Sequence, residues 1–380
     1  MIALNTPTFW IVCAVAVMVV VPVRSFAVRK SILACVNATF VVLLLQWQAI
    51  GLAGAILATY FVLQLVARPR YRVLFGGLLG VLVVSLFVVH KLPAVSTNLG
   101  TDAIARVLTV IGYSYVALRI IEVLRAVFEG RHEAPDFVSM VNYLLPFHML
   151  AAGPIQAYDD FVAHANDQFE PSASDVLVGF ERIASGLFKK LVLAHLLQTL
   201  FLTNLQSSGL YFFLEMQLTF IWLFLDFSAY SDIAAGVGIL IGVATPENFN
   251  RPLLARNLID FWERWHISLS QFIRRNVFIP IQLFLMRREE GRSPLLSFAV
   301  AIAISFVLCG LWHGLGTGFL IWGVVQALGL VVARIYADVL KARLGRAGVQ
   351  KYLMNPWFKA AGIVLTFEVQ ATALLALMRG

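Results

Sequence analysis

Two histidines lie in apolar stretches with aromatic neighbours. His313 ends an apolar run in the segment Cys309-Gly-Leu-Trp-His-Gly-Leu-Gly-Thr-Gly318, where glycines surround it. Glycine permits close backbone approach and sharp chain reversal, and a neutral imidazole can accept a proton near neutral pH. The segment therefore indicates either a general base or, more simply, a helix-packing seam that ends in a hydrogen-bonded histidine.

The second histidine, His266, lies in the segment Phe261-Trp-Glu-Arg-Trp-His-Ile-Ser-Leu-Ser-Gln-Phe-Ile-Arg-Arg275. At about 100° per residue, an apolar face that includes Trp262 and His266 covers an arc of about 120°, opposite the charged residues. The pattern predicts an amphipathic helix over Trp262–Ile273, at the cytoplasmic interface. Its aromatic face serves either as a membrane anchor or as part of a site.

A third polar cluster, Asp226-Phe-Ser-Ala-Tyr-Ser-Asp232, interrupts the apolar stretch 211–244. On a helix, Asp226 and Tyr230 share one face. Ionisable groups in apolar segments are costly and are candidates for function. The cluster indicates either a hydrogen-bond network that joins helices or a polar lining for a substrate path.

Other kinds of site find no support in the sequence. It contains no Walker loop, dinucleotide-binding glycine pattern, GxSxG elbow or HExxH motif. Cys13, Cys35 and Cys309 lie in apolar runs without CxxC spacing, and no histidine pair has the spacing of metal ligands. We therefore expect no metal site and no disulfide framework.

The elements that carry these residues must lie in a bilayer. Of the 380 residues, 60% are hydrophobic and only 13% are charged, whereas soluble proteins are about 25% charged. The sequence predicts an integral membrane protein. Its net charge of +8 is then explained by cytoplasmic loops that face anionic lipid, and not by nucleic-acid binding.

A membrane-spanning helix needs about 20 apolar residues. In the N-terminal part such runs lie near 8–23, 31–46, 49–67, 73–90 and 102–124. The first run lacks a charged leader and a small-residue cleavage site, so we expect a retained helix and not a signal peptide. Later runs are shorter or are broken by Gly and Pro, which is typical of backbone that lines a buried site.

The loops between these five runs and after the last contain 3, 0, 3, 1 and 2 Lys and Arg residues in turn. Positively charged loops remain in the cytoplasm. We therefore expect an extracytoplasmic N-terminus and a cytoplasmic loop at Arg68–Arg72.

Five motifs, in this order, resemble the membrane-bound O-acyltransferase (MBOAT) family, and within it the bacterial branch of alginate O-acetylation and teichoic-acid D-alanylation. They are Ala152–Ile155, Asp226–Ile233, Pro246–Pro252, Phe261–Leu269 and Gly310–Gly314. Together they cover roughly residues 140–330, half of the chain. The sequence departs from the family where it has Arg275 instead of a frequent Asp, and where it reads Trp322–Gln326 in a stretch in which the family often has a histidine.

The resemblance implies an all-α polytopic bundle of roughly ten to twelve membrane-embedded helices, with re-entrant segments around a central funnel. We expect N-terminal transmembrane helices in 1–136, the catalytic core in 137–335, and a cytoplasmic segment with the last transmembrane helix in 336–380.

The resemblance also implies that His313 is the catalytic residue and His266 a second characteristic position. Acyl transfer to a hydroxyl needs a base that takes the proton as oxygen attacks a thioester. Because the Trp-His-Gly motif has no nearby nucleophile except Cys309, direct transfer is favoured over an acyl-enzyme. The candidate substrate-binding residues are Asp226, Tyr230, Asp232, Asn250, Arg251, Trp262, Arg264, Trp265 and Trp312.

The expected function is transfer of an acyl group, with acetyl favoured, from a cytoplasmic thioester to a hydroxyl of an extracytoplasmic polysaccharide. One alternative is D-alanyl transfer from a carrier protein to a cell-envelope polymer. Alternatives from other classes are a polytopic transporter or flippase of a glycan or acyl carrier, and a non-catalytic scaffold. Dependence of turnover on His313 discriminates between them.

We expect no permanently bound cofactor, and a donor that is acyl-CoA or a phosphopantetheinyl acyl carrier protein. Arg264, Arg274 and Arg275 are expected to face the cytoplasm and steer this donor. The other expected partners are the bilayer and an extracytoplasmic glycan or a second periplasmic or extracellular acyltransferase. The expected location is the bacterial cytoplasmic (inner) membrane, with several passes.

Overall fold

The chain is described from a computed structural model. The structure describes residues 6–68, 70–71, 73, 76–77, 80–81, 113–164, 171–202, 209–288 and 294–379. Within these ranges the chain is helical, and its one pairing of extended backbone is an isolated bridge between Phe249 and Trp265. The prediction of an all-α fold is confirmed. The predicted runs near 73–90 and 102–124 fall partly, and the loop at Lys91 wholly, outside the described residues.

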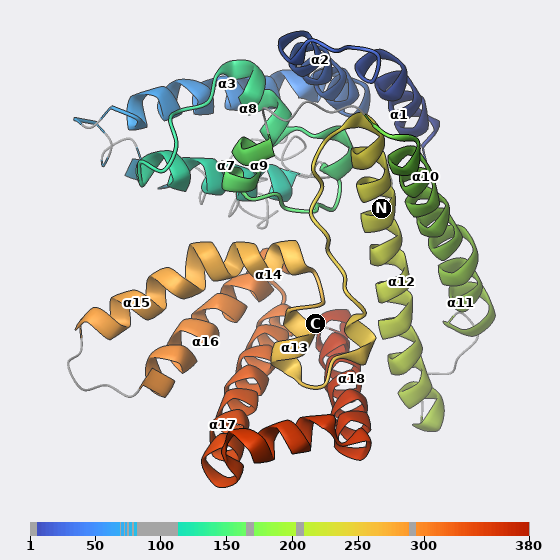
Figure 1. Cartoon of the computed structure of the whole chain (residues 1–380), viewed down its shortest axis with the longest axis vertical. Helices are drawn as coiled ribbons and strands as arrows, with labels where there is room; N and C mark the ends of the chain where they lie inside the picture. The colour runs from blue at the N-terminus through green and yellow to red at the C-terminus, as the bar shows by residue number, and fades with distance from the viewer. Residues whose placement is uncertain are drawn as a thin grey trace. The chain divides into compact units, whose positions relative to one another are not determined.

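The chain forms two compact units, and the first comprises Met1–Leu187 and Ala229–Pro246. Short 3-10 turns, Gln46–Gln48 and Phe147–Met149, join some of its helices. Figure 1 shows its helices, which are α1 (Pro7–Val20), α2 (Phe26–Leu45), α3 (Ala49–Val66), α7 (Tyr113–Phe128), α8 (Phe137–Leu144), α9 (Tyr158–His164), α10 (Ala173–Phe188) and the last part of α12 (Gly209–Ile241).

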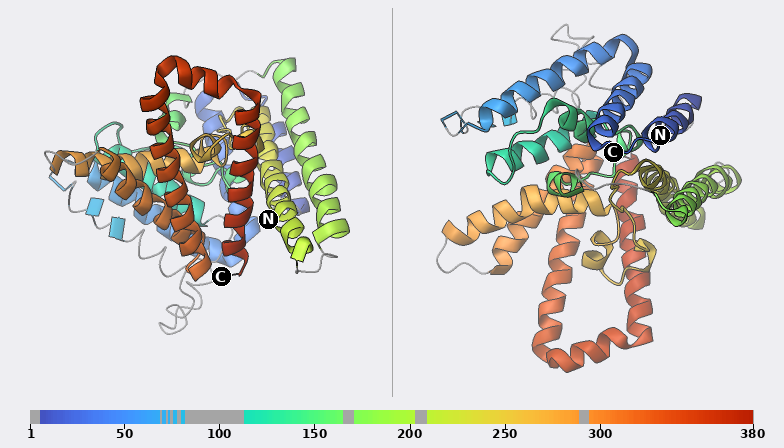
Figure 2. Two further views of the ribbon diagram at one scale, coloured as in Figure 1. Left: turned by 90° about the horizontal axis from the view of Figure 1, so that it is seen from below. Right: turned by 45° about the horizontal axis from the view of Figure 1, so that its top comes forward.

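The second unit comprises Phe188–Ser228 and Glu247–Gly380. In Figure 2 the long helix α17 turns at Gly345, whose φ is 62°, and its last part crosses to the start of α18. Besides the first part of α12 and the short turn Pro252–Leu254, its helices are α11 (His195–Leu197), α13 (Leu258–Trp262), α14 (Ile267–Ile273), α15 (Ile279–Arg288), α16 (Pro294–His313), α17 (Thr317–Met354) and α18 (Pro356–Arg379), with π-helical segments at Lys189–Ala194, Gln198–Leu202 and Arg274–Phe278. The sequence-based division at residues 136 and 335 stays a prediction.

Five described helices are long and apolar enough to cross a membrane: Phe26–Leu45, Ala49–Val66, Tyr211–Ile241, Pro294–His313 and Thr317–Met354. Large apolar side chains project outward from them; Ile50 is 77% exposed and Val332 is 64% exposed. Water would penalise this surface, whereas lipid accommodates it. The chain is therefore a multi-pass membrane protein. The predicted total of ten to twelve helices and the central funnel stay predictions.

Polar contacts in the first unit bring the ends of three predicted cytoplasmic loops together. The Lys30 ammonium lies 2.7 Å from the Asp136 carboxylate, and the Gln64 side-chain amide donates to the Pro135 carbonyl at 2.9 Å. The loops after α1, α3 and α7 therefore share one side of this unit, as their Lys and Arg content predicts. That this side is cytoplasmic stays a prediction.

Helices α10 and α12 approach each other closely through glycines (Figure 1). A Cβ on Gly186 would lie 2.6 Å from the Ala229 carbonyl oxygen, and one on Gly236 would lie 2.6 Å from the Gly179 carbonyl oxygen. Small residues permit such backbone contact in membranes, where dispersion and not water drives helix association. The same two helices carry the Arg182–Asp232 ion pair, with N and O 2.8 Å apart.

The predicted continuous helix over Trp262–Ile273 is wrong. Helix α13 ends at Trp262 and α14 begins at Ile267, and between them His266 adopts a left-handed backbone with φ 43° and ψ 52°. Hydrogen bonds from the 246–252 motif hold the break: Asn250 N–H donates to Arg264 O at 2.9 Å, and Ile267 N–H donates to Asn248 O at 3.0 Å. Tertiary backbone pairing therefore overrides the helical periodicity.

Candidate active site

His313 is the last residue of α16, at a point where α16 and α17 pack backbone to backbone. A Cβ on Gly310 would lie 2.3 Å from the Phe319 carbonyl oxygen, and one on Gly314 would lie 2.2 Å from the Phe319 ring. These glycines therefore permit close packing of the two helices, as the simpler interpretation of the segment Cys309–Gly318 predicts. They also leave the His313 side chain exposed at the helix end.

Aromatic rings flank the His313 imidazole on two sides. Ring centroids are 4.7 Å from Trp312 and 5.5 Å from Trp322, both in edge-on geometry. Trp322 also packs against Trp262 at 5.9 Å. These contacts restrict the orientation of the imidazole, and the residue remains exposed.

His266 is buried, and its imidazole is oriented by Asn248. The Nδ1 atom lies 3.3 Å from Asn248 Oδ1, which also accepts from Ser268 Oγ at 2.6 Å. Because Asn248 Oδ1 acts as an acceptor, Nδ1 carries the proton and Nε2 keeps the lone pair. The Phe227 ring packs edge-on against this imidazole, with centroids 4.8 Å apart.

Burial, and secondarily the nearby His313, lowers the pKa of His266 to about 3. Its imidazole is therefore neutral at pH 7 and is a weak proton acceptor, because the charged form is poorly solvated. This difference in environment separates the two histidines: His266 is held neutral and fixed, whereas His313 is exposed at its helix end.

Both histidines line one cavity of the second unit, with a volume of about 250 Å³. Among the described residues its wall is almost entirely apolar, and Gln370 contributes the one polar side chain besides the histidines and tryptophans. Of the other predicted site residues, Trp262 and Trp265 line it as well. The remaining lining residues are Phe220, Leu223, Phe227, Phe261, Leu269, Trp322 and Leu374.

A buried amide pair fixes the tryptophan side of this cavity. Trp262 Nε1–H donates to Gln326 Oε1 at 3.0 Å. Gln326 and Gln370 exchange two amide hydrogen bonds, each 3.0 Å long. Gln326, which lies in the stretch where the family often has a histidine, is thus a structural link between α13, α17 and α18.

Several other predicted substrate-binding residues make structural contacts and do not line this cavity. Asp226 forms an ion pair with Lys190, and Arg264 donates to Asp260 at 2.5 Å. Asn250 joins the backbone pairing described above, and Arg251 adopts a left-handed backbone with φ 49°. Trp312 contacts the His313 ring without lining the cavity.

Tyr230 and Asp232 belong to the first unit. The Tyr230 hydroxyl donates to the His148 carbonyl at 3.0 Å, and Asp232 pairs with Arg182. These contacts favour the interpretation of the Asp226–Asp232 cluster as a network that joins helices. A part for these residues in substrate binding stays a prediction.

The sequence alone did not indicate a part in the site for Asn248, Phe227 or Gln370. Asn248 lies inside the 246–252 motif, but the motif does not show its contact with His266. In the part of the chain that the structure describes, no group of three or more His, Cys, Asp or Glu side chains is arranged to hold a metal ion.

Two histidines on an aromatic cavity of a multi-pass helical protein are compatible with a membrane acyltransferase. The chain is a member of the membrane-bound O-acyltransferase family, whose model matches residues 36–369. This membership makes it an O-acyltransferase and sets aside the transporter and scaffold alternatives.

Three similar proteins illustrate the family. A teichoic acid D-alanyltransferase of Streptococcus thermophilus is 27% identical over 98% of this chain and 93% of its own length. A peptidoglycan O-acetyltransferase of Helicobacter pylori is 30% identical over 54% of this chain and 38% of its own length. A probable alginate O-acetylase of Pseudomonas aeruginosa is 30% identical over 65% of this chain and 47% of its own length.

Proposed function

We propose that this protein transfers a short acyl group, with acetyl favoured, from a cytoplasmic thioester to a hydroxyl of an extracytoplasmic cell-envelope polysaccharide. The observation that carries the proposal is the aromatic cavity on which His266 and His313 meet. Relatives that act on teichoic acid, peptidoglycan and alginate support a polymeric acceptor. The membrane is then the cytoplasmic (inner) membrane of a bacterium.

In this mechanism His313 is the general base. Its imidazole takes the proton of the acceptor hydroxyl while the oxygen attacks the thioester carbonyl. The carbon–sulfur bond breaks, and the imidazolium returns the proton to the leaving thiolate. Cys309 is buried, and burial of this kind disfavours the thiolate that nucleophilic attack requires. Direct transfer is therefore favoured over an acyl-enzyme.

His266 orients the donor and does not take the proton. Its neutral imidazole, fixed through Asn248, keeps the Nε2 lone pair in a constant direction. The apolar wall excludes water that would otherwise hydrolyse the thioester. A cavity of about 250 Å³ suits a short acyl group, because drug-sized ligands occupy pockets of about 300–1,000 Å³.

D-alanyl transfer is the second candidate, and one observation favours it. The S. thermophilus D-alanyltransferase matches nearly the whole of both chains, whereas this chain spans less than half of the two O-acetyl-transferring relatives named above. The donor would then be a phosphopantetheinyl carrier protein instead of acyl-CoA.

Mass spectrometry of purified cell-envelope glycans, with and without this protein, tests the proposal. We expect loss of one kind of ester, and its mass distinguishes acetyl from D-alanyl. A strain that carries the His313→Gln protein at normal abundance should lose the same ester. Unchanged glycan esters in the deletion strain would refute an envelope polysaccharide as the acceptor.

A further inference from the structure

Three tryptophans line the cavity of the two histidines, and their indole N–H groups differ in their hydrogen bonds. The Trp262 N–H donates to Gln326 Oε1 at 3.0 Å. The N–H groups of Trp265 and Trp322 have no acceptor among the described residues. An indole N–H can only donate, and a buried one usually has a partner. These two N–H groups are therefore candidates for binding a molecule in the cavity.

Trp322 is buried, yet its N–H remains accessible. The residue is 7% exposed. Its Nε1 has no acceptor and is nevertheless not one of the fully enclosed polar atoms of the described chain, so this nitrogen retains accessible surface. Because Trp322 lines the cavity, a ligand there can reach the N–H.

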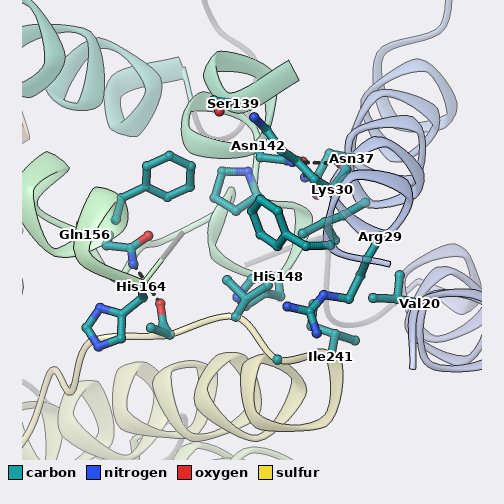
Figure 3. Close-up of a pocket in the computed structure, with 17 residues that line it drawn as sticks. Val20, Arg29, Lys30, Asn37, Ser139, Asn142, His148, Gln156, His164 and Ile241 are labelled. Atoms are coloured by element: carbon teal, nitrogen blue, oxygen red, sulfur yellow. Dashed lines mark hydrogen bonds between the residues drawn. The ribbon is translucent and has the colours of Figure 1, made fainter. Parts of the chain in front are cut away.

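The cavity in the first unit, shown in Figure 3, provides a comparison. There Asn37 Nδ2 donates to Asn142 Oδ1 at 3.0 Å, and Gln156 Nε2 donates to the Ala244 carbonyl at 2.9 Å. These donors are used within the protein, as is usual for buried polar groups. A buried donor without an acceptor on a cavity wall, as at Trp322, needs another explanation, and a bound ligand supplies one.

The Trp322 ring lies beside the proposed general base. Its centroid is 5.5 Å from that of the His313 imidazole and 5.9 Å from that of the Trp262 ring, both in edge-on geometry. The ring also packs against Phe306 at 6.4 Å. These contacts hold the indole next to the imidazole that would take the proton.

Trp265 carries the other N–H without an acceptor, but its ring has different neighbours. It stacks on Phe261 with centroids 5.5 Å apart and packs edge-on against Phe249 at 5.2 Å. No ring contact joins Trp265 to His313 in the described part of the chain. Of the two N–H groups, that of Trp322 is therefore the one next to the proposed base.

The wall of this cavity offers neutral donors for a developing negative charge. None of its described lining residues is Lys or Arg. When a hydroxyl oxygen attacks a thioester, the carbonyl oxygen gains negative charge, and donors that are already oriented stabilise it strongly in a site that excludes water. An N–H group held beside the base meets this requirement.

We propose that the Trp322 N–H donates a hydrogen bond to the carbonyl oxygen of the thioester and stabilises the oxyanion that forms during transfer. This role rests on the proposed acyl transfer. As the acceptor oxygen bonds to the carbonyl carbon, His313 takes its proton, and the C=O electron pair moves to the carbonyl oxygen, which Trp322 binds. The electron pair then returns, the carbon–sulfur bond breaks, and the imidazolium gives the proton to the thiolate.

The test compares variants of Trp322 in the purified full-length protein, with acetyl-CoA, or with D-alanyl carrier protein if the glycan analysis finds D-alanyl esters. Trp322→Phe keeps an aromatic ring next to His313 and removes the N–H. We expect its kcat to fall on the order of 10²-fold with little change in donor KM, because the oxyanion develops in the transition state. Trp322→His has a smaller ring but supplies an N–H again, so it should keep more activity than Trp322→Phe.

Trp357→Phe is the matched control, because Trp357 in α18 is 82% exposed and does not line the cavity. It should keep the kcat of the unaltered protein. Thermal unfolding shows whether each variant is folded. Trp322→Leu, which also lacks the N–H, takes the place of Trp322→Phe if that protein does not fold.

Two results would overturn the role of Trp322. The first is a folded Trp322→Phe protein with the kcat of the unaltered protein. The second is a Trp322→His protein that is no more active than Trp322→Phe, because packing against His313, and not the N–H, would then support turnover. A lack of acyl transfer by the unaltered protein is a different result: it would contradict the proposed function itself, and with it the reaction in which Trp322 acts.

Discussion

Asn248 shows how one side chain fixes a functional geometry. Its Oδ1 accepts from Ser268 and from His266, while its backbone carbonyl accepts from Ile267. These bonds hold the left-handed backbone at His266, which non-glycine residues rarely adopt without support. Asn248 is therefore a positioning residue that acts through His266.

We predict that Asn248→Leu lowers kcat on the order of tenfold, because the His266 imidazole loses the acceptor that orients it. Asn248→Asp keeps the acceptor oxygen and should retain more activity. Steady-state kinetics of both variants, with thermal unfolding as the control for folding, measure the effect. A correctly folded Asn248→Leu protein with the kcat of the unaltered enzyme would show that Asn248 does not contribute to turnover.

The sequence identified the two histidines because their types and surroundings are unusual in an apolar chain. It could not identify Asn248 or Gln370, since their importance depends on contacts with residues 18 and 44 positions away. It predicted that Asp226 and Asp232 bind substrate, and it could not show that both pair with cations of neighbouring segments; their part in substrate binding stays a prediction. The type of a residue shows that its charged side chain is costly to bury in a membrane, but it does not show which residue pairs with it.

At the scale of helices, the glycine contact between α10 and α12 carries a prediction. Gly186→Leu should separate the two helices, because even a Cβ would meet the Ala229 carbonyl at 2.6 Å. We expect a clear fall in the thermal unfolding midpoint, since such overpacking typically costs about 1–3 kcal/mol.

Gly54→Leu is the matched control, because Gly54 lies in α3 and its Cβ would meet nothing within 4 Å. It should unfold at nearly the temperature of the unaltered protein. Equal midpoints for the Gly186 and Gly54 variants would show that the close approach of α10 and α12 is not needed for stability.

The segment after His266 carries the prediction on donor entry. Arg274 is exposed and Arg275 is half-buried, at the start of the π-helical turn Arg274–Phe278. If both steer an anionic thioester donor, Arg274→Gln with Arg275→Gln should raise the KM for donor, most strongly at low salt. Arg334→Gln, an exposed change elsewhere in this unit, serves as the control.

The measurement is the KM for acetyl-CoA, or for D-alanyl carrier protein if the glycan analysis finds D-alanyl esters, at low and high salt. A donor KM that is unchanged at low salt would leave Arg274 and Arg275 as membrane anchors only.

The same segment shows where helical periodicity misleads. The apolar residues of Trp262–Ile273 would share one face of a continuous helix, yet the helix is interrupted at His266. Its aromatic residues face inward because they surround a cavity, and not because a continuous helix lies on the membrane. Long spans such as Phe26–Leu45 were predictable because bilayer thickness alone sets their length.

At the scale of the whole molecule, the orientation in the membrane is the prediction to check. We expect the N-terminus outside and the loop at Arg68–Arg72 inside the cytoplasm. Single cysteines at Thr6 and at Arg70, in a protein without Cys13, Cys35 and Cys309, can be labelled with an impermeant maleimide on intact cells. Thr6→Cys should react and Arg70→Cys should not; the reverse pattern would invert the topology.

In the proposed mechanism one imidazole, that of His313, performs the proton transfer. His313→Gln keeps the approximate size and hydrogen bonding of the side chain but cannot take the proton. A general base of this kind contributes about 10²–10⁴ in rate. His266→Gln is the comparison, because it changes the neutral, buried histidine of the same cavity.

The most direct test is the rate of acyl transfer by purified, folded His313→Gln protein, with the donor and acceptor that the glycan analysis identifies. We expect no detectable transfer above background, while His266→Gln transfers slowly. A His313→Gln protein that transfers acyl groups near the normal rate would contradict the proposed mechanism.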